Sequence, residues 1–233
     1  MWEIVSWANF RRRFRHTVPA TSGCEVAGEQ EAAFLIRDNI RHRNDILHAY
    51  ITAINGAQSE ILIANAYFLP GLRFGLALHA AARRGVRITV LLQGKTDHPL
   101  LRYATQTLYA ALLKAGMRIY EYERSFMHAK VAVIDRLWAT VGSSNIDPFS
   151  LLLAKEANLF VRNPAFAAEL HASVDRAIAS GAREVLAGEL TAHPWYIRAL
   201  RWLSYGLVRA IVGLTGYGQK HWQPDERTPD PGS

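Results

Sequence analysis

Apolar positions follow two different periods along residues 31–162, and each period predicts one kind of element. Runs of consecutive apolar, often β-branched residues predict buried strands, as in residues 61–68 and 86–93. Between such runs, apolar residues recur every four positions, as Ile46, Tyr50 and Ile54 do, and this spacing predicts helices. The alternation of strands and crossover helices predicts an α/β domain.

The predicted elements follow one another through the central part of the chain. Strands are predicted at residues 32–37, 61–68, 86–93, 117–122, 131–134, 138–142 and 156–162. Helices are predicted at residues 41–57, 73–84, 100–115, 165–179 and 182–190. This order predicts a mixed, largely parallel sheet with helices on both faces.

The two ends of the chain differ in composition from this central domain, which we place at residues 31–192. Residues 1–18 combine an apolar stripe with an arginine run and predict a helix, and the glycines and proline of residues 19–30 predict a linker. Residues 193–217 are apolar and aromatic, whereas residues 218–233 are polar, rich in proline and predicted to be disordered.

The segment 193–217 predicts an amphipathic helix. Arg198, Arg201 and Arg209 interrupt its apolar residues, and a spanning helix needs about 20 predominantly apolar residues. Trp and Tyr with interspersed arginine favour a helix that lies in the plane of a membrane interface. The alternative is a helix that packs back on the domain.

Charge and cysteine content narrow the classes of partner and site. The formal net charge of +7 favours anionic partners, either nucleic acid or an anionic bilayer surface. Cys24 is the single cysteine, so an intrachain disulfide and a cysteine-based zinc site are excluded. This cysteine content fits a reducing compartment. The N-terminal region lacks the pattern of a secretory signal.

One stretch, residues 128–145, indicates a chemistry. His128 opens the strand run at residues 131–134, and Lys130 follows two positions later, so both side chains are predicted to project from one face. An imidazole beside an ammonium group suits a phosphate. Asp135 closes the same strand, where it could fix a neighbouring loop.

The next predicted strand ends in the turn Gly142-Ser-Ser-Asn145. Backbone N–H groups of this turn, the Ser143 hydroxyl and the Asn145 amide are predicted to hold phosphate oxygens. Further candidates lie at the carboxyl ends of two earlier strands, where ligands bind in such sheets. Tyr67 and Phe68 are candidates for a substrate pocket and Lys95 for a phosphate contact, with loop packing or solvation as equal alternatives.

The spacing HxK(x)4D(x)6GSxN resembles the HKD motif of the phospholipase D superfamily. Softer motifs, at residues 37–39, 63–71, 91–94 and 156–159, resemble the C-terminal half of bacterial cardiolipin synthases. The resemblance implies an α-β-α sandwich and assigns catalytic roles to His128, Lys130, Asp135 and Glu156. Glu156 would hydrogen-bond the catalytic imidazole, and Lys130, Ser143 and Asn145 would bind the substrate phosphate.

The resembled enzymes carry two HKD motifs, whereas this sequence contains one. The resemblance therefore implies a truncated or split reading frame whose second motif comes from a twin or a complementing chain. The implied reaction is phosphatidyl transfer between two phosphatidylglycerol molecules through a phosphohistidine, without metal or cofactor. It implies a peripheral protein on the cytoplasmic side of the bacterial inner membrane.

Two alternatives of other classes remain open. A homodimeric, metal-independent phosphodiesterase, either a phospholipase D or a nuclease, would use the same residues and the same positive charge, with nucleic acid as a partner only in the nuclease case. An inactive remnant would keep the amphipathic helix with an incomplete site.

Overall fold

The computed structural model describes residues 30–38, 42–95, 99–147, 150, 154–191 and 195–214. The strands are β1 (Glu31–Arg37), β2 (Glu60–Asn65), β3 (Arg87–Gln93), β4 (Arg118–Tyr122), β5 (Lys130–Ile134), β6 (Trp138–Gly142), β7 (Glu156–Arg162) and β8 (Ala182–Glu184). The helices are α1 (Asp45–Gly56), α2 (Leu72–Arg83), α3 (Pro99–Lys114), α5 (Pro164–Gly181), α6 (Ala187–Thr191) and α7 (Trp195–Leu214). The N-terminal helix and linker predicted before residue 30 and the tail beyond residue 214 lie outside the described residues.

The strands form one mixed sheet in the order β1-β7-β6-β5-β2-β3-β4-β8. Only β2, β3 and β4 pair in parallel within this described sheet, and its other neighbouring pairs are antiparallel. The mixed sheet is confirmed, but the prediction of a largely parallel one is wrong. The turn between β5 and β6 is too short for the crossover that a parallel pair needs.

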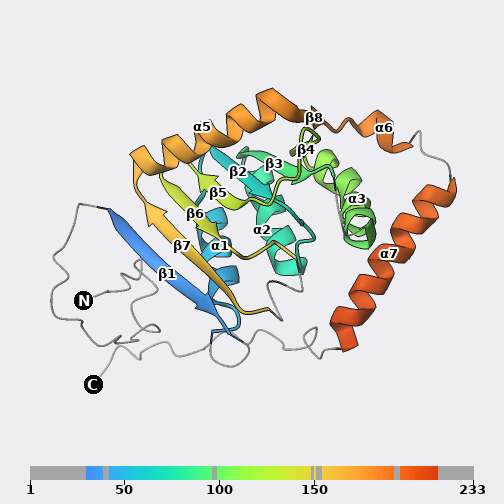
Figure 1. Ribbon diagram of the computed structural model, residues 1–233, viewed down its shortest axis with the longest axis horizontal. Coiled ribbons are helices and arrows are strands. Elements are labelled where there is room, and N and C mark those ends of the chain that lie inside the picture. The colour runs from blue at the N-terminus through green and yellow to red at the C-terminus, as the bar shows by residue number, and fades with distance from the viewer. Residues whose placement is uncertain are drawn as a thin grey trace, which may run out of the picture.

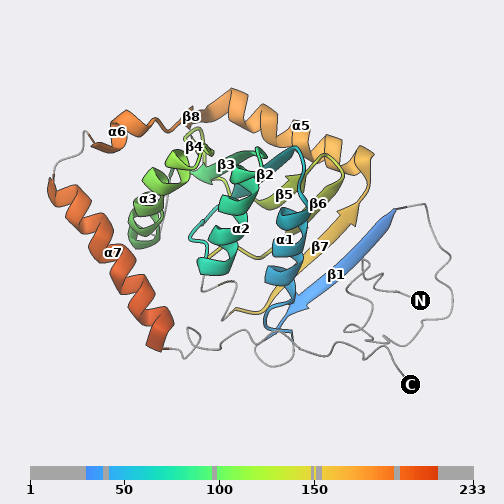
Figure 2. The ribbon, with the colours of Figure 1, turned by 180° about the vertical axis from the view of Figure 1, so that it is seen from behind.

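Helices cover both faces of the sheet, as predicted (Figures 1 and 2). On one face α1, α2 and α3 bury the main core, in which the rings of Tyr50, Phe74, Trp138 and Phe160 pack together. On the other face α5 crosses several strands and buries Ala167 and Val174 against them. Burying both faces explains the continuous apolar run of β2, in which every residue is buried.

The predicted helix over residues 182–190 is wrong in its first part. Residues Ala182–Glu184 form β8, which pairs with the edge strand β4, and only Ala187–Thr191 is helical. Glu184 accepts a hydrogen bond of 3.1 Å from the Arg118 side chain on β4. The free edge of β4 therefore outweighs the local helix propensity.

The last helix, α7, lies along α3 at one end of the molecule (Figure 1). The Oγ1 of Thr107 on α3 donates to the Arg201 carbonyl at 3.1 Å, and Val208 packs into a small cluster with Leu69 and Ala104. Among the described helices, none combines the length and hydropathy of a membrane-spanning segment.

Candidate active site

His128 and Lys130 stand at the start of β5, beside the carboxyl end of β2. The strand begins at Lys130, not at His128 as predicted, although the Ala66 N–H still donates to the Ala129 carbonyl at 2.9 Å. His128 is exposed, and Lys130 is 7% exposed with its Nζ donating to the His128 carbonyl at 3.2 Å. Among the described residues, nothing forms a hydrogen bond with the His128 ring, so the imidazole is open to a substrate.

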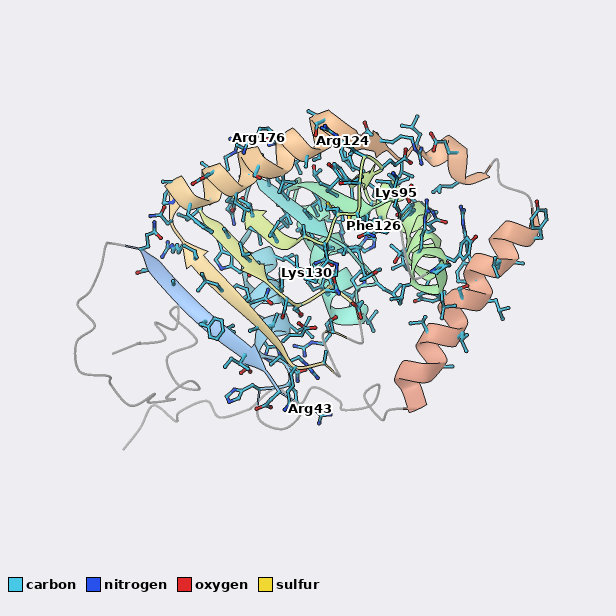
Figure 3. All side chains as sticks on the ribbon, viewed as in Figure 1. Arg43, Lys95, Arg124, Phe126, Lys130 and Arg176 are labelled. Atoms are coloured by element: carbon cyan, nitrogen blue, oxygen red, sulfur yellow. The ribbon has the colours of Figure 1, made fainter. Side chains whose placement is uncertain are left out.

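The side chain of Lys130 is labelled in Figure 3, and two opposing effects act on the pKa of its ammonium group. Burial lowers the pKa of Lys130, and the carboxylates of Glu156 and Asp147 act against this by raising it. Because these carboxylates interact with the ammonium, the structure brings Lys130 and Glu156 into one site.

Gly142 begins the predicted turn because a neighbouring side chain leaves no room for a Cβ. A Cβ at this position would lie 2.3 Å from the Asn158 side chain. Asn158 is fully buried, and its Oδ1 accepts from the Ser144 N–H at 3.3 Å while its Nδ2 donates to Thr140 Oγ1 at 3.3 Å. Asn158 therefore fixes the turn, a role that the sequence analysis missed.

Two backbone N–H groups of the turn, those of Ser143 and Ser144, are already bonded within the protein. The Ser143 N–H donates to the Ala157 carbonyl at 3.0 Å, and the Ile146 N–H donates to Asn65 Oδ1 at 3.2 Å. The Ser144 N–H is bound by Asn158, as above. Fewer backbone donors of this turn are therefore open to a phosphate than the sequence predicted.

Ser143 and Glu156 are hydrogen-bonded to each other. The Ser143 hydroxyl donates to Glu156 Oε2, and its Oγ accepts from the Ala157 N–H at 3.0 Å. The expected hydrogen bond between Glu156 and the His128 imidazole is absent from the described contacts. The register pairs Glu156 with Arg37, whose side chain is buried at the end of β1.

Two asparagines present unsatisfied polar atoms at this end of the sheet. Asn145 Nδ2 donates weakly to Ser150 Oγ at 3.5 Å, whereas its buried Oδ1 has no partner among the described residues. Asn65, paired with Lys130 across the strands, likewise has a buried Nδ2 without a described partner. A buried donor without a partner costs free energy, so Asn65 is a phosphate-binding candidate. Its signal in the sequence is a single asparagine within an otherwise apolar strand run.

Asp135 lies at the opposite end of β5, and the structure does not bring it together with His128 and Lys130. Its carboxylate accepts hydrogen bonds from the backbone N–H groups of Gln58, Ser59 and Glu60 at 2.9, 2.8 and 3.0 Å. Asp135 therefore fixes the loop before β2, as the sequence suggested, and it lies apart from the other residues that were predicted to be catalytic.

The other predicted pocket residues separate into two groups. Tyr67 and Phe68 line a hollow with Gln93 and Arg102, although Phe68 is itself fully buried in the core. Lys95 lies apart from Lys130, toward α3, and its Nζ is 3.5 Å from the Arg124 carbonyl (Figure 3). Lys95 is therefore a weaker phosphate candidate than Lys130.

The site thus combines an open imidazole, an ammonium group and amide groups at one end of the central strands β2 and β5. Such a set can attack a phosphodiester and offset the charge on its oxygens. Three or more metal-ligating side chains do not cluster anywhere in the described part of the chain.

Comparisons with known proteins agree with this architecture. A family model described as "Cardiolipin synthase, PLD-like domain" matches residues 50–178. The chain is 41% identical to "Cardiolipin synthase B" of Shigella flexneri over 194 residues. This matched region covers 83% of this chain and 47% of that protein. It thus spans about half the length of this curated relative.

Solved structures show the same fold at low sequence identity. Phosphatidylserine synthase of Haemophilus influenzae superposes with a TM-score of 0.62 at 13% identity, covering 83% of this chain and 49% of that one. The phospholipase D family member Nuc of Salmonella typhimurium gives 0.57 at 19% identity, covering 67% of this chain and 99% of that one. With the family match over residues 50–178, the chain belongs to the family of cardiolipin synthase, phospholipase D-like domains.

Proposed function

We propose that the chain supplies one imidazole of a phosphatidyltransferase that joins two phosphatidylglycerol molecules into cardiolipin. The observation that carries this proposal is the open His128 ring next to the buried ammonium of Lys130. The family and the curated relative support the choice of lipid substrates.

The proposed reaction uses two imidazoles in turn. One attacks phosphorus while the bond from phosphorus to glycerol oxygen breaks, and the second imidazolium gives the departing oxygen its proton. The second imidazole then takes the proton from a hydroxyl of another phosphatidylglycerol. That oxygen attacks phosphorus, and the bond from phosphorus to nitrogen breaks.

Each residue of the site has a proposed part in these steps. His128 is one imidazole, and the other comes from a second copy or a complementing chain with its own motif, because one ring cannot serve as nucleophile and opposed acid at once. Lys130, Asn145 and Asn65 offset the charge on the phosphorane oxygens. Ser143 and Glu156 hold the wall of the site beside them.

We also propose that α7 binds the cytoplasmic surface of the bacterial inner membrane. Its outward stripe is apolar, with Tyr196, Leu200, Leu203 and Leu207 at least 40% exposed. Arg201 and Ser204, by contrast, are buried against the domain. This reversed polarity, with the 65% exposed Trp202 beside it, supports an interfacial helix.

The reaction is tested with vesicles of labelled phosphatidylglycerol. The purified chain is incubated alone and with the part of the Shigella flexneri relative that it does not match. We expect cardiolipin and an acid-labile phosphohistidine adduct in at least one of these arms. Neither adduct nor cardiolipin in both arms would overturn the function, and cleavage of plasmid DNA without metal would favour a nuclease.

The membrane surface is tested by co-sedimentation with the same vesicles. Leu203→Glu should weaken binding about tenfold or more, because it places a charge in the apolar stripe. Leu137→Glu, at the far end of the sheet where Asp135 lies, is the matched control and should bind as the unaltered chain does. Equal binding by Leu203→Glu and the control would exclude α7 as the membrane surface.

A further inference from the structure

A hollow opens beside the site, between the carboxyl ends of β2 and β3 and the first turns of α3. Ala66, Tyr67, Gln93, Arg102 and Tyr109 are among the residues that line it. Ala66 connects it to the site, because its N–H donates to the carbonyl of Ala129, the residue between His128 and Lys130, at 2.9 Å. The hollow therefore adjoins the strand end that carries His128 and Lys130.

The guanidinium of Arg102 is only weakly held on the wall of this hollow. Its Nη2 is 3.7 Å from Glu121 Oε2, which is an ion pair but longer than a hydrogen bond. Its buried Nε has no hydrogen-bond partner among the described residues. An arginine has five N–H donors, so Arg102 retains donors for another group.

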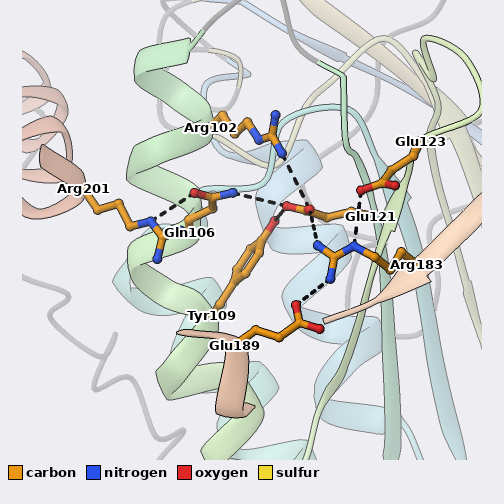
Figure 4. A network of polar contacts seen from close by, with 8 residues as sticks. All are labelled: Arg102, Gln106, Tyr109, Glu121, Glu123, Arg183, Glu189 and Arg201. Carbon is orange, nitrogen blue, oxygen red and sulfur yellow. Dashed lines mark hydrogen bonds and ion pairs between the residues drawn. The ribbon is translucent and has the colours of Figure 1, made fainter. Parts of the chain in front are cut away.

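The Glu121 carboxylate has hydrogen-bond donors other than Arg102 (Figure 4). Its carboxylate accepts from the Tyr109 hydroxyl at 3.0 Å, from Gln106 Nε2 at 3.4 Å and from Arg183 Nη2 at 3.3 Å. All three contacts are shorter than the one to Arg102. The Glu121 carboxylate therefore explains little of why an arginine stands at position 102.

A second arginine adds positive charge beside the same carboxylate. Arg201 of α7 donates from its Nε to Gln106 Oε1 at 3.1 Å (Figure 4). Burial lowers the pKa of Arg201, the carboxylate of Glu121 acts against burial, and the nearby charge of Arg102 lowers the pKa further. The two guanidinium groups thus repel each other, and an added anion at Arg102 would relieve that repulsion.

We propose that Arg102 binds the phosphodiester of the acceptor lipid, at a subsite separate from the reacting phosphate at His128 and Lys130. This inference rests on the proposed function. The two phosphates of the product are joined by one glycerol, so the acceptor's own phosphate must lie within one headgroup of the phosphohistidine. Ala66 and Arg102 line the same hollow, so the guanidinium lies on the side of the site where this second phosphate is proposed.

The subsite determines which nucleophile attacks the intermediate. Attack by the acceptor hydroxyl gives cardiolipin, whereas attack by water gives phosphatidic acid. In both cases the bond from phosphorus to nitrogen breaks, and the second imidazole takes the proton of the attacking hydroxyl or water. Arg102 favours the lipid by a charge-assisted, bidentate hydrogen bond to its phosphate. A water molecule carries no phosphate, so Arg102 does not favour attack by water in the same way.

The first experiment measures the ratio of cardiolipin to phosphatidic acid, which loss of folded protein alone does not change. Arg102→Gln should lower this ratio about tenfold, by removing a charged hydrogen bond to the acceptor. Arg102→Lys should give a ratio between that of the unaltered chain and that of Arg102→Gln. The matched control is Arg118→Gln, which removes an exposed arginine paired with Glu184 on the neighbouring strand and should leave the ratio unchanged.

An unchanged ratio in Arg102→Gln, with the unaltered chain active, would overturn the subsite and leave the proposed function intact. A second experiment does not depend on turnover. Dihexanoyl phosphatidylglycerol is titrated by calorimetry into His128→Ala, where we expect two binding events, and into His128→Ala with Arg102→Gln, where we expect one. The same number of events in both variants would overturn the subsite even if no reaction is found.

A third titration, with inorganic phosphate, distinguishes a lipid phosphodiester site from a general anion site. We expect phosphate to bind much more weakly than the lipid at Arg102. Phosphate binding that Arg102→Gln abolishes, with lipid binding unaffected, would contradict a lipid subsite.

Discussion

The two ends of strand β5 carry the two parts of the motif, and they differ in how fully their polar groups are bonded. At one end Asp135 accepts three backbone N–H groups and the Ser59 hydroxyl, which lies 2.8 Å from its Oδ1. Burial alone would raise the pKa of Asp135, but these hydrogen bonds outweigh it and hold the pKa below its usual value.

The neighbouring carboxylate at the same end is also saturated. Glu60 accepts from Arg87 at 2.6 Å and from Arg136 at 2.7 Å, and the His171 ring lies 3.2 Å from it. Burial would raise the pKa of Glu60, yet these basic partners lower it. The charges at this end therefore hold the fold together.

At the other end of β5 the polar groups are left open. The His128 ring has no hydrogen-bond partner among the described residues, and Asn65 and Asn145 each leave one buried atom without a described partner. Buried polar groups are normally bonded, so the buried Asn65 Nδ2 donor without a described partner, on the strand beside Lys130, points to an anionic ligand. One motif thus divides its residues between stability and chemistry, and substitutions at the two ends should separate these effects.

The largest expected effect is that of His128→Ala on turnover. Removal of the nucleophile or of the acid should lower the rate at least about 10³-fold while the midpoint of thermal unfolding stays the same, because the ring is exposed. His79→Ala, a histidine on α2 outside the site, is the control. Product formation within tenfold of the unaltered chain would remove His128 from the reaction.

Lys130→Ala should have the next largest effect. Loss of the ammonium should lower turnover about 10²- to 10³-fold, because it removes charge stabilisation at the phosphorane oxygens. The rate is measured at saturating lipid, with Lys114→Ala in the last turn of α3 as the control. A change in KM alone, without a change in kcat, would indicate ground-state binding only.

The sequence predicted most strands well, because the strands depend on local patterns, and the site residues at this end remain a prediction from the motif. The apolar runs of β2 and β3 and the spacing from His128 to Asn145 are contained in short stretches of chain. Hydrophobic periodicity carries no information on strand direction, however, so the apolar runs alone did not predict that β5 and β6 pair antiparallel.

The residues that the sequence did not reveal act across the sheet. Asn158 fixes the turn at Gly142 from the neighbouring strand, and Asn65 faces Lys130 from another. The same holds for β8, whose pairing with β4 depends on a partner far away in sequence. Such roles follow from register, which one sequence does not specify.

Asp135→Asn should act on stability instead of turnover. The amide would turn an N–H group toward backbone donors, so the free energy of unfolding should fall by about 2 to 3 kcal/mol. Asparagine tolerates the positive φ of 52° at this position, so backbone strain does not contribute. Activity per folded molecule should stay within about twofold of the unaltered chain, since the carboxylate lies at the far end of β5.

The pH dependence of this difference is a further test. The folded pKa of Asp135 lies below the unfolded one, so its stabilisation is complete above about pH 4 and is lost as the pH falls through the folded pKa. Urea unfolding of both proteins should therefore differ at pH 7 and converge in acid. Glu169→Gln, on the exposed side of α5, is the control, and a difference that grows in acid would contradict this assignment.

The smallest expected effect is that of Glu156→Gln, which tests how the two ends differ in charge. Burial lowers the pKa of Lys130, and Glu156 raises it, so loss of this carboxylate should lower the pKa further. The ammonium would then lose its proton at lower pH, and the alkaline limb of the pH–rate profile should move to lower pH.

At neutral pH the rate of Glu156→Gln should fall about tenfold or less, since a glutamine can still accept the hydrogen bond of the Ser143 hydroxyl. Glu169→Gln on α5 is the control, and an alkaline limb that stays in place would show that Glu156 has no influence on Lys130 during turnover.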